Sequence, residues 1–140
     1  MQQQKIDALA KYLKCDPGKI VSSPMKDLFS YQKNQFLVYS EIEADNACFD
    51  IIKENLYTQN AEFVLYWTNL NYNDKIVLTF KNMMERYKDQ CNDFLFSLLR
   101  NTCGFDAFSD AVIKNAGSRG YFIAGDEKEH KKGNYFIYRK

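Results

Sequence analysis

The feature that most constrains this sequence is a long apolar stripe between Asn73 and Gly104. Its members recur at alternating spacings of three and four residues, which places them on one face of an α-helix. They are Val77, Phe80, Met84, Tyr87, Cys91, Phe94 and Leu98. Asn73 can cap the first turn, and Gly104 suits the left-handed residue that ends a helix. The pattern predicts one long central helix, and further leucines beside the stripe favour a covered core helix over a coiled-coil dimer.

The N-terminal part of the chain predicts a short helix followed by a β-hairpin. Apolar residues share one helical face over residues 3–14, and an Asp-Pro-Gly sequence stops that pattern. Two runs rich in strand-forming residues, 28–31 and 35–39, then flank the short segment 32–34. This spacing is typical of two antiparallel strands joined by a tight loop.

A second helix is expected to begin at Glu41, because Ser40 and Glu43 have the spacing of a capping box. Each side chain can then accept a hydrogen bond from the free amide of the other residue. Apolar residues continue on one stripe of this helix, which we expect to pack against the central helix. They are Ala44, Ala47, Cys48, Ile51, Ile52 and Leu56. An aromatic helix is predicted over residues 63–70.

The C-terminal part predicts a final helix and a second hairpin. Residues 106–116 have helical spacing, whereas 121–124 and 135–138 alternate as strands do, on either side of the charged loop 125–133. Two terminal hairpins can join into one small antiparallel sheet packed on the helices. We therefore predict an α+β fold in a single domain, residues 1–140.

Composition excludes several classes of function. The four cysteines form no C-x-x-C pair and His130 is the only histidine, so we expect no metal site and no cofactor. His130 lies in a charged hairpin tip, where an orienting partner and a cleft are unexpected, so we predict no catalytic residue and no enzyme. The N-terminus lacks a signal-peptide core, and no apolar run reaches about 20 residues. These features predict a cytoplasmic protein with free thiols that does not enter a membrane.

The net charge of +1 conceals a segregation of charge along the chain. Residues 1–40 and 117–140 each carry +3, whereas 41–116 carry seven basic and twelve acidic side chains. Within the acidic part, Glu43, Asp50 and Glu54 line one face of the second helix. Such a row can bind a basic partner by imitating phosphates, or it can be the solvated face of an amphipathic helix.

A second candidate surface is the C-terminal hairpin. Arg119, Lys131, Lys132 and Arg139 accompany several aromatic rings there, including Tyr138. Cations for phosphates and rings for base stacking are typical of single-stranded nucleic-acid binding. In the alternative interpretation, strand alternation buries these rings on the two faces of the sheet. Arg119 lies in a short turn, which predicts that it is held more rigidly than the lysines.

The order of these pieces resembles a group of small, mostly uncharacterised bacteriophage proteins. The segments that carry the resemblance are 12–20 (YLKCDPGKI), 36–45 (FLVYSEIEAD), 118–129 (SRGYFIAGDEKE) and 135–139 (YFIYR). The resemblance implies a stoichiometric inhibitor of a host defence complex, a restriction or CRISPR nuclease (an anti-CRISPR type protein), acting in the host cytoplasm. The alternative is a single-stranded nucleic-acid-binding accessory module. The identity of the partner and the oligomeric state stay open.

Overall fold

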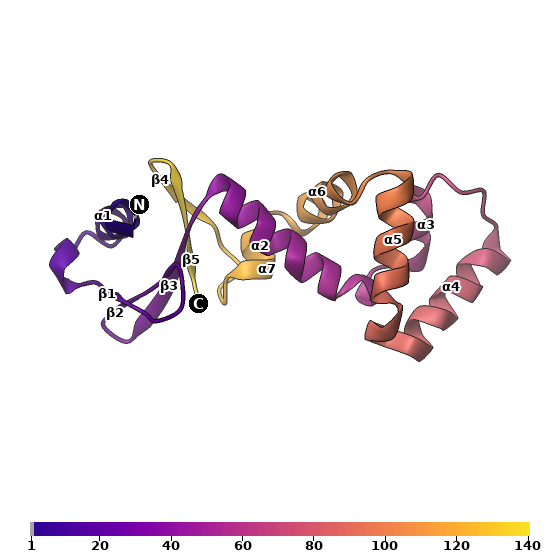
Figure 1. The fold of residues 1–140 in the computed structure, drawn as a ribbon, viewed down its shortest axis with the longest axis horizontal. Helices are drawn as coiled ribbons and strands as arrows, with labels where there is room; N and C mark the ends of the chain where they lie inside the picture. Colours follow the sequence, from indigo (N-terminus) through magenta and orange to yellow (C-terminus); the bar gives the residue numbers. More distant parts are fainter. Residues whose placement is uncertain (1) are drawn as a thin grey trace. The chain divides into compact units, whose positions relative to one another are not determined.

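The structure is a computed structural model and describes residues 2–140. It confirms the predicted α+β class, with an antiparallel sheet built from strands near both ends of the chain (Figure 1). The α-helices are α1 (Gln2–Leu13), α2 (Glu41–Glu54), α3 (Ala61–Trp67), α4 (Asp74–Tyr87), α5 (Asn92–Thr102), α6 (Phe105–Ala116) and α7 (Gly120–Ile123). The strands are β1 (Val21–Ser22), β2 (Leu28–Tyr31), β3 (Asn34–Ser40), β4 (His130–Lys132) and β5 (Tyr135–Arg139). Single 3-10 turns are η1 (Pro17–Lys19), η2 (Leu56–Thr58) and η3 (Lys88–Cys91).

The chain forms two compact units. The terminal unit combines the residues up to Cys48 with Ala116–Lys140, and the helical unit is Phe49–Asn115. The first unit holds the whole sheet, and the second contains α3, α4 and α5. The organisation of the chain as one domain stays a prediction from the sequence.

The terminal unit contains a sheet with strand order β1-β2-β3-β5-β4, in which every pair is antiparallel. β3 pairs with β2 through the predicted N-terminal hairpin and with β5 along its other edge. Phe36 lies opposite Arg139, and Ser40 lies opposite Tyr135. The joining of the two ends of the chain, expected from the sequence, therefore occurs between β3 and β5.

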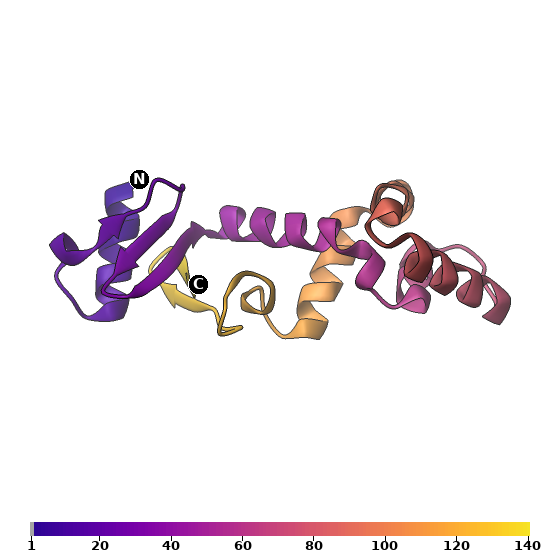
Figure 2. The same cartoon turned by 90° about the horizontal axis from the view of Figure 1, so that it is seen from below.

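Both faces of this sheet are covered. Leu9 and Ala10 of α1 pack with Val38 and Ile137 on one face, and Figure 2 shows α1 beside the strands. On the other face, Ala44 of α2 and Ala124 after α7 pack with Phe136 and Tyr138. The predicted alternation along β5 is thus present, because Ile137 faces α1 while its two neighbours face away.

The first strand of the C-terminal hairpin differs from the prediction. Residues 121–124 do not form a strand, since α7 occupies Gly120–Ile123, and β4 lies instead at His130–Lys132. A Cβ on Gly120 would lie 2.4 Å from the carbonyl carbon of Lys128, so this glycine allows the close approach of two backbone segments. That tertiary contact overrides the strand preference of the aromatic residues that follow. β4 is an edge strand, which explains its lack of apolar side chains.

In the helical unit, the predicted central helix is present but divided. α4 and α5 are separated by η3, where Lys88 has φ 51°, and they run in different directions (Figure 1). The interruption changes which side chains are buried. Met84 and Cys91 of the predicted stripe are buried, but α5 buries Leu95 and Leu99 while Phe94 is 51% exposed.

Aromatic rings, of which Phe108 is fully buried, pack beside the aliphatic core of the helical unit. Phe105 of α6 packs against Phe49 and Phe96, with ring centroids 6.5 Å and 4.9 Å apart. Phe63 of α3 packs against Phe108 at 5.5 Å. α6 therefore joins α2, α3 and α5 of this unit through edge-to-face and tilted ring contacts, which bury large apolar area.

Candidate functional site

The predicted acidic row on α2 is divided between two sites. Glu43 belongs to the terminal unit, whereas Asp50 and Glu54 belong to the helical unit. Glu43 forms the predicted capping box with Ser40, and it also accepts hydrogen bonds from Lys5 at 2.8 and 3.0 Å. Its carboxylate is therefore engaged within the protein rather than free on a helix face.

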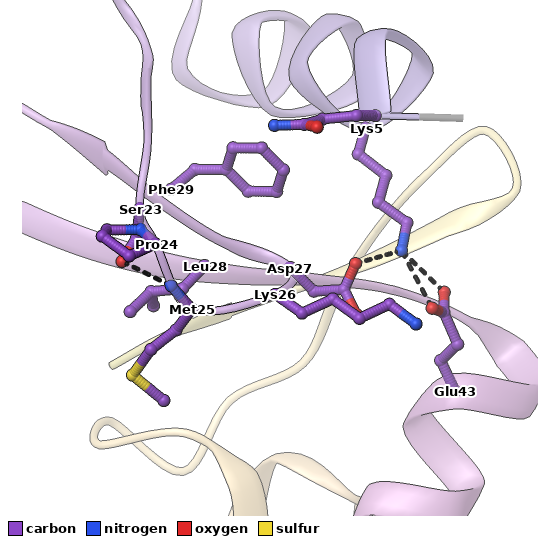
Figure 3. Close-up of a pocket in the computed structure, with 10 residues that line it drawn as sticks. Lys5, Ser23, Pro24, Met25, Lys26, Asp27, Leu28, Phe29 and Glu43 are labelled. Carbon is purple, nitrogen blue, oxygen red and sulfur yellow. Dashed lines mark hydrogen bonds and ion pairs between the residues drawn. The ribbon is translucent and has the colours of Figure 1, made fainter.

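The buried Lys5 forms a charged triad with the partly buried carboxylates of Asp27 and Glu43 beside a cavity (Figure 3). The Lys5 ammonium lies 2.5 Å from Asp27 Oδ1, and its side chain is only 6% exposed. Burial opposes ionisation of Glu43, but the hydrogen bonds from Lys5 and Ser40 outweigh it and lower the pKa of Glu43 to about 2. Burial likewise lowers the pKa of Lys5, and its two carboxylate partners more than reverse that effect, so its pKa is raised.

Asp50 and Glu54 border a second hollow, with a volume of about 610 Å³, which we call the acidic hollow. Its lining residues are Asp50, Lys53, Glu54, Asp89, Asn92 and Asp93. Four carboxylates thus face one ammonium group. Asp89 and Asp93 were missed from the sequence, because the division of the central helix at η3 sets their directions.

Two contacts hold the acidic hollow in shape. The Asn92 side chain accepts from the amide of Tyr57 at 2.9 Å and donates to the carbonyl of Glu54 at 2.6 Å, which ties α5 to the end of α2. Lys53 lies over the ring of Phe96, 4.2 Å from its centroid. The one cation of the hollow is therefore attracted to an aromatic face as well as to the carboxylates. Among residues 2–140, no group of three or more acidic, cysteine or histidine side chains is arranged to hold a metal ion.

Arg119 is buried, in contrast to the contact role expected for it. Only 8% of the residue is exposed. Its guanidinium donates to Glu129 at 2.7 Å, to Asp45 at 2.9 Å and to the carbonyl of Glu41 at 3.3 Å. It also lies 4.4 Å from the centroid of the Phe136 ring. Arg119 is therefore held in place by contacts inside the terminal unit, where it connects α2, α7 and the sheet.

Tyr138 is a second correction among the hairpin residues. Its side chain is completely buried, and its hydroxyl donates to Glu129. Burial, together with the adjacent Glu129 carboxylate, raises the pKa of Tyr138 far above its usual range. A ring held in this way cannot stack on a base, so Tyr138 belongs to the core.

The other three predicted hairpin residues are exposed. Lys131 and Lys132 lie on the edge strand β4, and Arg139 lies near the end of β5 with a hydrogen bond to Asn34 at 2.9 Å. Arg139 borders a hollow of about 400 Å³, which we call the basic hollow. Its lining residues are Ser30, Gln32, Lys33, Asn34, Gln35, Arg139 and Lys140. The structure adds Lys33 to the basic residues named from the sequence.

His130 and Cys48, which were considered for catalysis, do not have the surroundings that an active site would require. The His130 ring packs against Tyr12 at 4.9 Å between centroids. Cys48 is buried, and burial raises the pKa of its thiol to about 12, so the thiolate is disfavoured. The absence of enzymatic activity stays a prediction. Within the described chain, no helix is both long and apolar enough to span a membrane.

Comparisons with protein-family models, with curated proteins and with solved structures give no significant match. The charged hollows described above are therefore the features from which we propose a function.

Proposed function

We propose that this protein inhibits a host defence complex, a restriction or CRISPR nuclease, by binding it stoichiometrically in the cytoplasm through the acidic hollow. The observation that carries the proposal is the convergence of Asp50, Glu54, Asp89 and Asp93 on one open hollow of the helical unit. The sequence resemblance to small bacteriophage proteins supports the biological setting.

The chemistry of a nuclease explains why an acidic surface suits this role. Proteins that hold nucleic acid do so with arginine and lysine side chains arranged along the phosphate backbone. A rigid group of carboxylates can compete for those cations, and complementary charge speeds association and excludes partners of the wrong sign. Asn92 connects the segments that carry the carboxylates, so their arrangement is set before a partner binds.

Affinity capture from the native host tests the proposal. The wild-type protein is compared with a variant in which the four carboxylates of the acidic hollow are replaced by amides: Asp50→Asn, Glu54→Gln, Asp89→Asn and Asp93→Asn. The matched control neutralises four exposed carboxylates of the helical unit outside the hollow: Glu62→Gln, Asp74→Asn, Asp106→Asn and Asp110→Asn. Both variants change the net charge equally, and circular dichroism verifies that both are folded.

We expect the wild type and the control to retain a nuclease complex that the hollow variant loses. Equal capture by all three proteins would remove the acidic hollow from the account. If the wild type captured no defence complex, and a phage lacking the protein grew equally on defended and undefended cells, the proposed function would be wrong.

The second candidate function is binding of single-stranded nucleic acid. The observation that favours it is the basic hollow, where Lys33, Arg139 and Lys140 contribute three cationic side chains and none of the described lining side chains is acidic. This function predicts binding that weakens as salt rises and drops when Arg139 and Lys33 are replaced by glutamine. Undetectable binding at low ionic strength would eliminate it.

A further inference from the structure

The proposed function does not use the cavity beside the charged triad. Its volume is about 460 Å³, and it lies within the terminal unit between α1 and the segment that enters β2. Figure 3 shows Lys5 reaching from α1 toward Asp27 and Glu43, while Pro24 and Met25 lie at the other side of the view. One end of the cavity is therefore charged and the other is apolar, a combination common in ligand sites.

The ammonium group of Lys5 is already occupied by its two carboxylate partners. It donates to Asp27 Oδ1 and to both oxygens of Glu43, which accounts for its hydrogen-bonding capacity. An anion that binds to Lys5 would have to displace one of these carboxylates. The triad itself carries one negative charge in excess, and the charge of Lys26 balances it over the cavity lining as a whole, so a preference for a cation comes from the triad carboxylates and not from the net charge of the cavity.

One carboxylate oxygen of Asp27 is not engaged by Lys5 and can accept a hydrogen bond from a ligand. Within residues 2–140, Asp27 Oδ2 receives no hydrogen bond, whereas Oδ1 binds Lys5. In that part of the chain, Ser109 Oγ is the one polar side-chain atom that is both fully buried and without a partner. Asp27 Oδ2 also lacks a partner, so it is not fully buried and solvent can reach it. A carboxylate oxygen of this kind accepts a strong hydrogen bond from an ammonium or guanidinium group.

We propose that this cavity binds the cationic end of a basic side chain, arginine or lysine, presented by a protein partner. The cation donates to Asp27 Oδ2, and the aliphatic stem lies along Pro24 and Met25, where Met25 is 60% exposed. Lys26 also lines the cavity and is exposed, so its charge opposes a cationic ligand. A variant that removes the charge of Lys26 should therefore bind a cationic ligand more tightly.

Nuclear magnetic resonance titration of the whole protein tests the proposal with Nα-acetyl-arginine amide as the probe. We expect saturable shifts of the amides of residues 23–29, with a dissociation constant in the millimolar range. The control ligand is Nα-acetyl-citrulline amide, which has the same shape without the charge and should cause no saturable shift. Nα-acetyl-lysine amide should bind at the same residues. Equal binding of the citrulline ligand, or saturable binding of inorganic phosphate there, would overturn the proposal.

Two single substitutions sharpen the test. Asp27→Asn should weaken binding about tenfold, because it removes the charge from the acceptor. Asp27 has φ 63°, a conformation that asparagine tolerates, and the amide oxygen can still accept from Lys5. Lys26→Gln should strengthen binding severalfold. Unchanged affinity in both variants would show that the probe binds elsewhere, and the Lys26 variant still decides the matter if the Asp27 variant fails to fold.

Discussion

A substitution of Arg119 distinguishes most directly between a structural role and a binding role for this residue. In the structure, its guanidinium connects Asp45 of α2 with Glu129 in the segment before β4 and lies over the ring of Phe136. We consider the substitution Arg119→Met, which keeps an unbranched side chain of similar length and removes the charge and every donor. It should destabilise the terminal unit.

The magnitude follows from what the substitution leaves behind. Removing one partner of a buried charge pair costs about 3–5 kcal/mol. Asp45 and Glu129 keep 42% and 21% of their side chains exposed, so water replaces part of the lost interaction. Losing the contact with Phe136 adds about 0.5–2 kcal/mol. With the compensation by water, we expect a total loss of about 2–4 kcal/mol.

Amide hydrogen exchange of Val38 and Ile137, in the centre of the sheet, measures this loss. The only tryptophan, Trp67, lies in the helical unit, so its fluorescence reports on another part of the chain. A loss of about 2–4 kcal/mol corresponds to exchange that is about 30- to 700-fold faster. Arg119→Lys should lose about half as much, because lysine keeps the charge but not the planar fork.

Arg139→Met is the matched control, because Arg139 is exposed and its side chain makes one hydrogen bond, to Asn34. It should change the exchange rates less than threefold. If Arg119→Met left exchange in the sheet unchanged, the connection through Asp45 and Glu129 would not stabilise the unit, and the burial argument would be refuted.

Three further predictions concern single groups. Gly120→Ala should destabilise the sheet by about 1–3 kcal/mol, since its Cβ would clash with the Lys128 backbone. Gly18→Ala is the control: its Cβ would lie 3.4 Å from the nearest atom, so amide hydrogen exchange in the sheet should be almost unchanged. The pKa of Glu43 is lowered to about 2 from 4.5 in the unfolded chain, so its stabilisation is complete above pH 4.5 and is lost as the pH falls toward 2. Urea midpoints at pH 5 and 2.5 should therefore differ more for the wild type than for Glu43→Gln; an equal difference would contradict the triad. The thiol of Cys48 should resist a thiol reagent until the chain unfolds, because burial raises its pKa to about 12, and rapid labelling of the native protein at Cys48 would show that it is accessible.

Local signals in the sequence predicted much of the fold. Ser40 and Glu43 predicted the start of α2, and the capping box is present with both hydrogen bonds. The strand runs around the loop 32–34 predicted the β2–β3 hairpin, since turn length and alternation depend on neighbouring residues. Asn73 accepts from the amide of Ile76, as expected for the cap of α4.

The remaining features depend on contacts between distant residues. Nothing in the local sequence marks Lys88 as a break, because it is neither glycine nor proline, yet the break rotates Leu95 and Leu99 into the core. The same limit applies to the charged residues. Lys5, Asp27 and Glu43 are up to 38 positions apart, so no spacing pattern could have predicted the triad.

The burial of Arg119 shows why the candidate surface was only partly predictable. A basic residue beside aromatic rings has the same local sequence whether it binds a nucleic acid or closes a core. Its two carboxylate partners, Asp45 and Glu129, lie 74 and 10 positions away. The local sequence around Arg119 therefore does not determine whether this residue binds a partner or stabilises the core.

The most direct test of the central claim is a titration of the nuclease activity of the captured host complex with purified protein. We expect cleavage to fall linearly and to stop at one equivalent of protein per complex, and we expect the variant lacking the four carboxylates of the acidic hollow not to inhibit. Full cleavage in the presence of excess wild-type protein, or equal inhibition by that variant, would contradict the account.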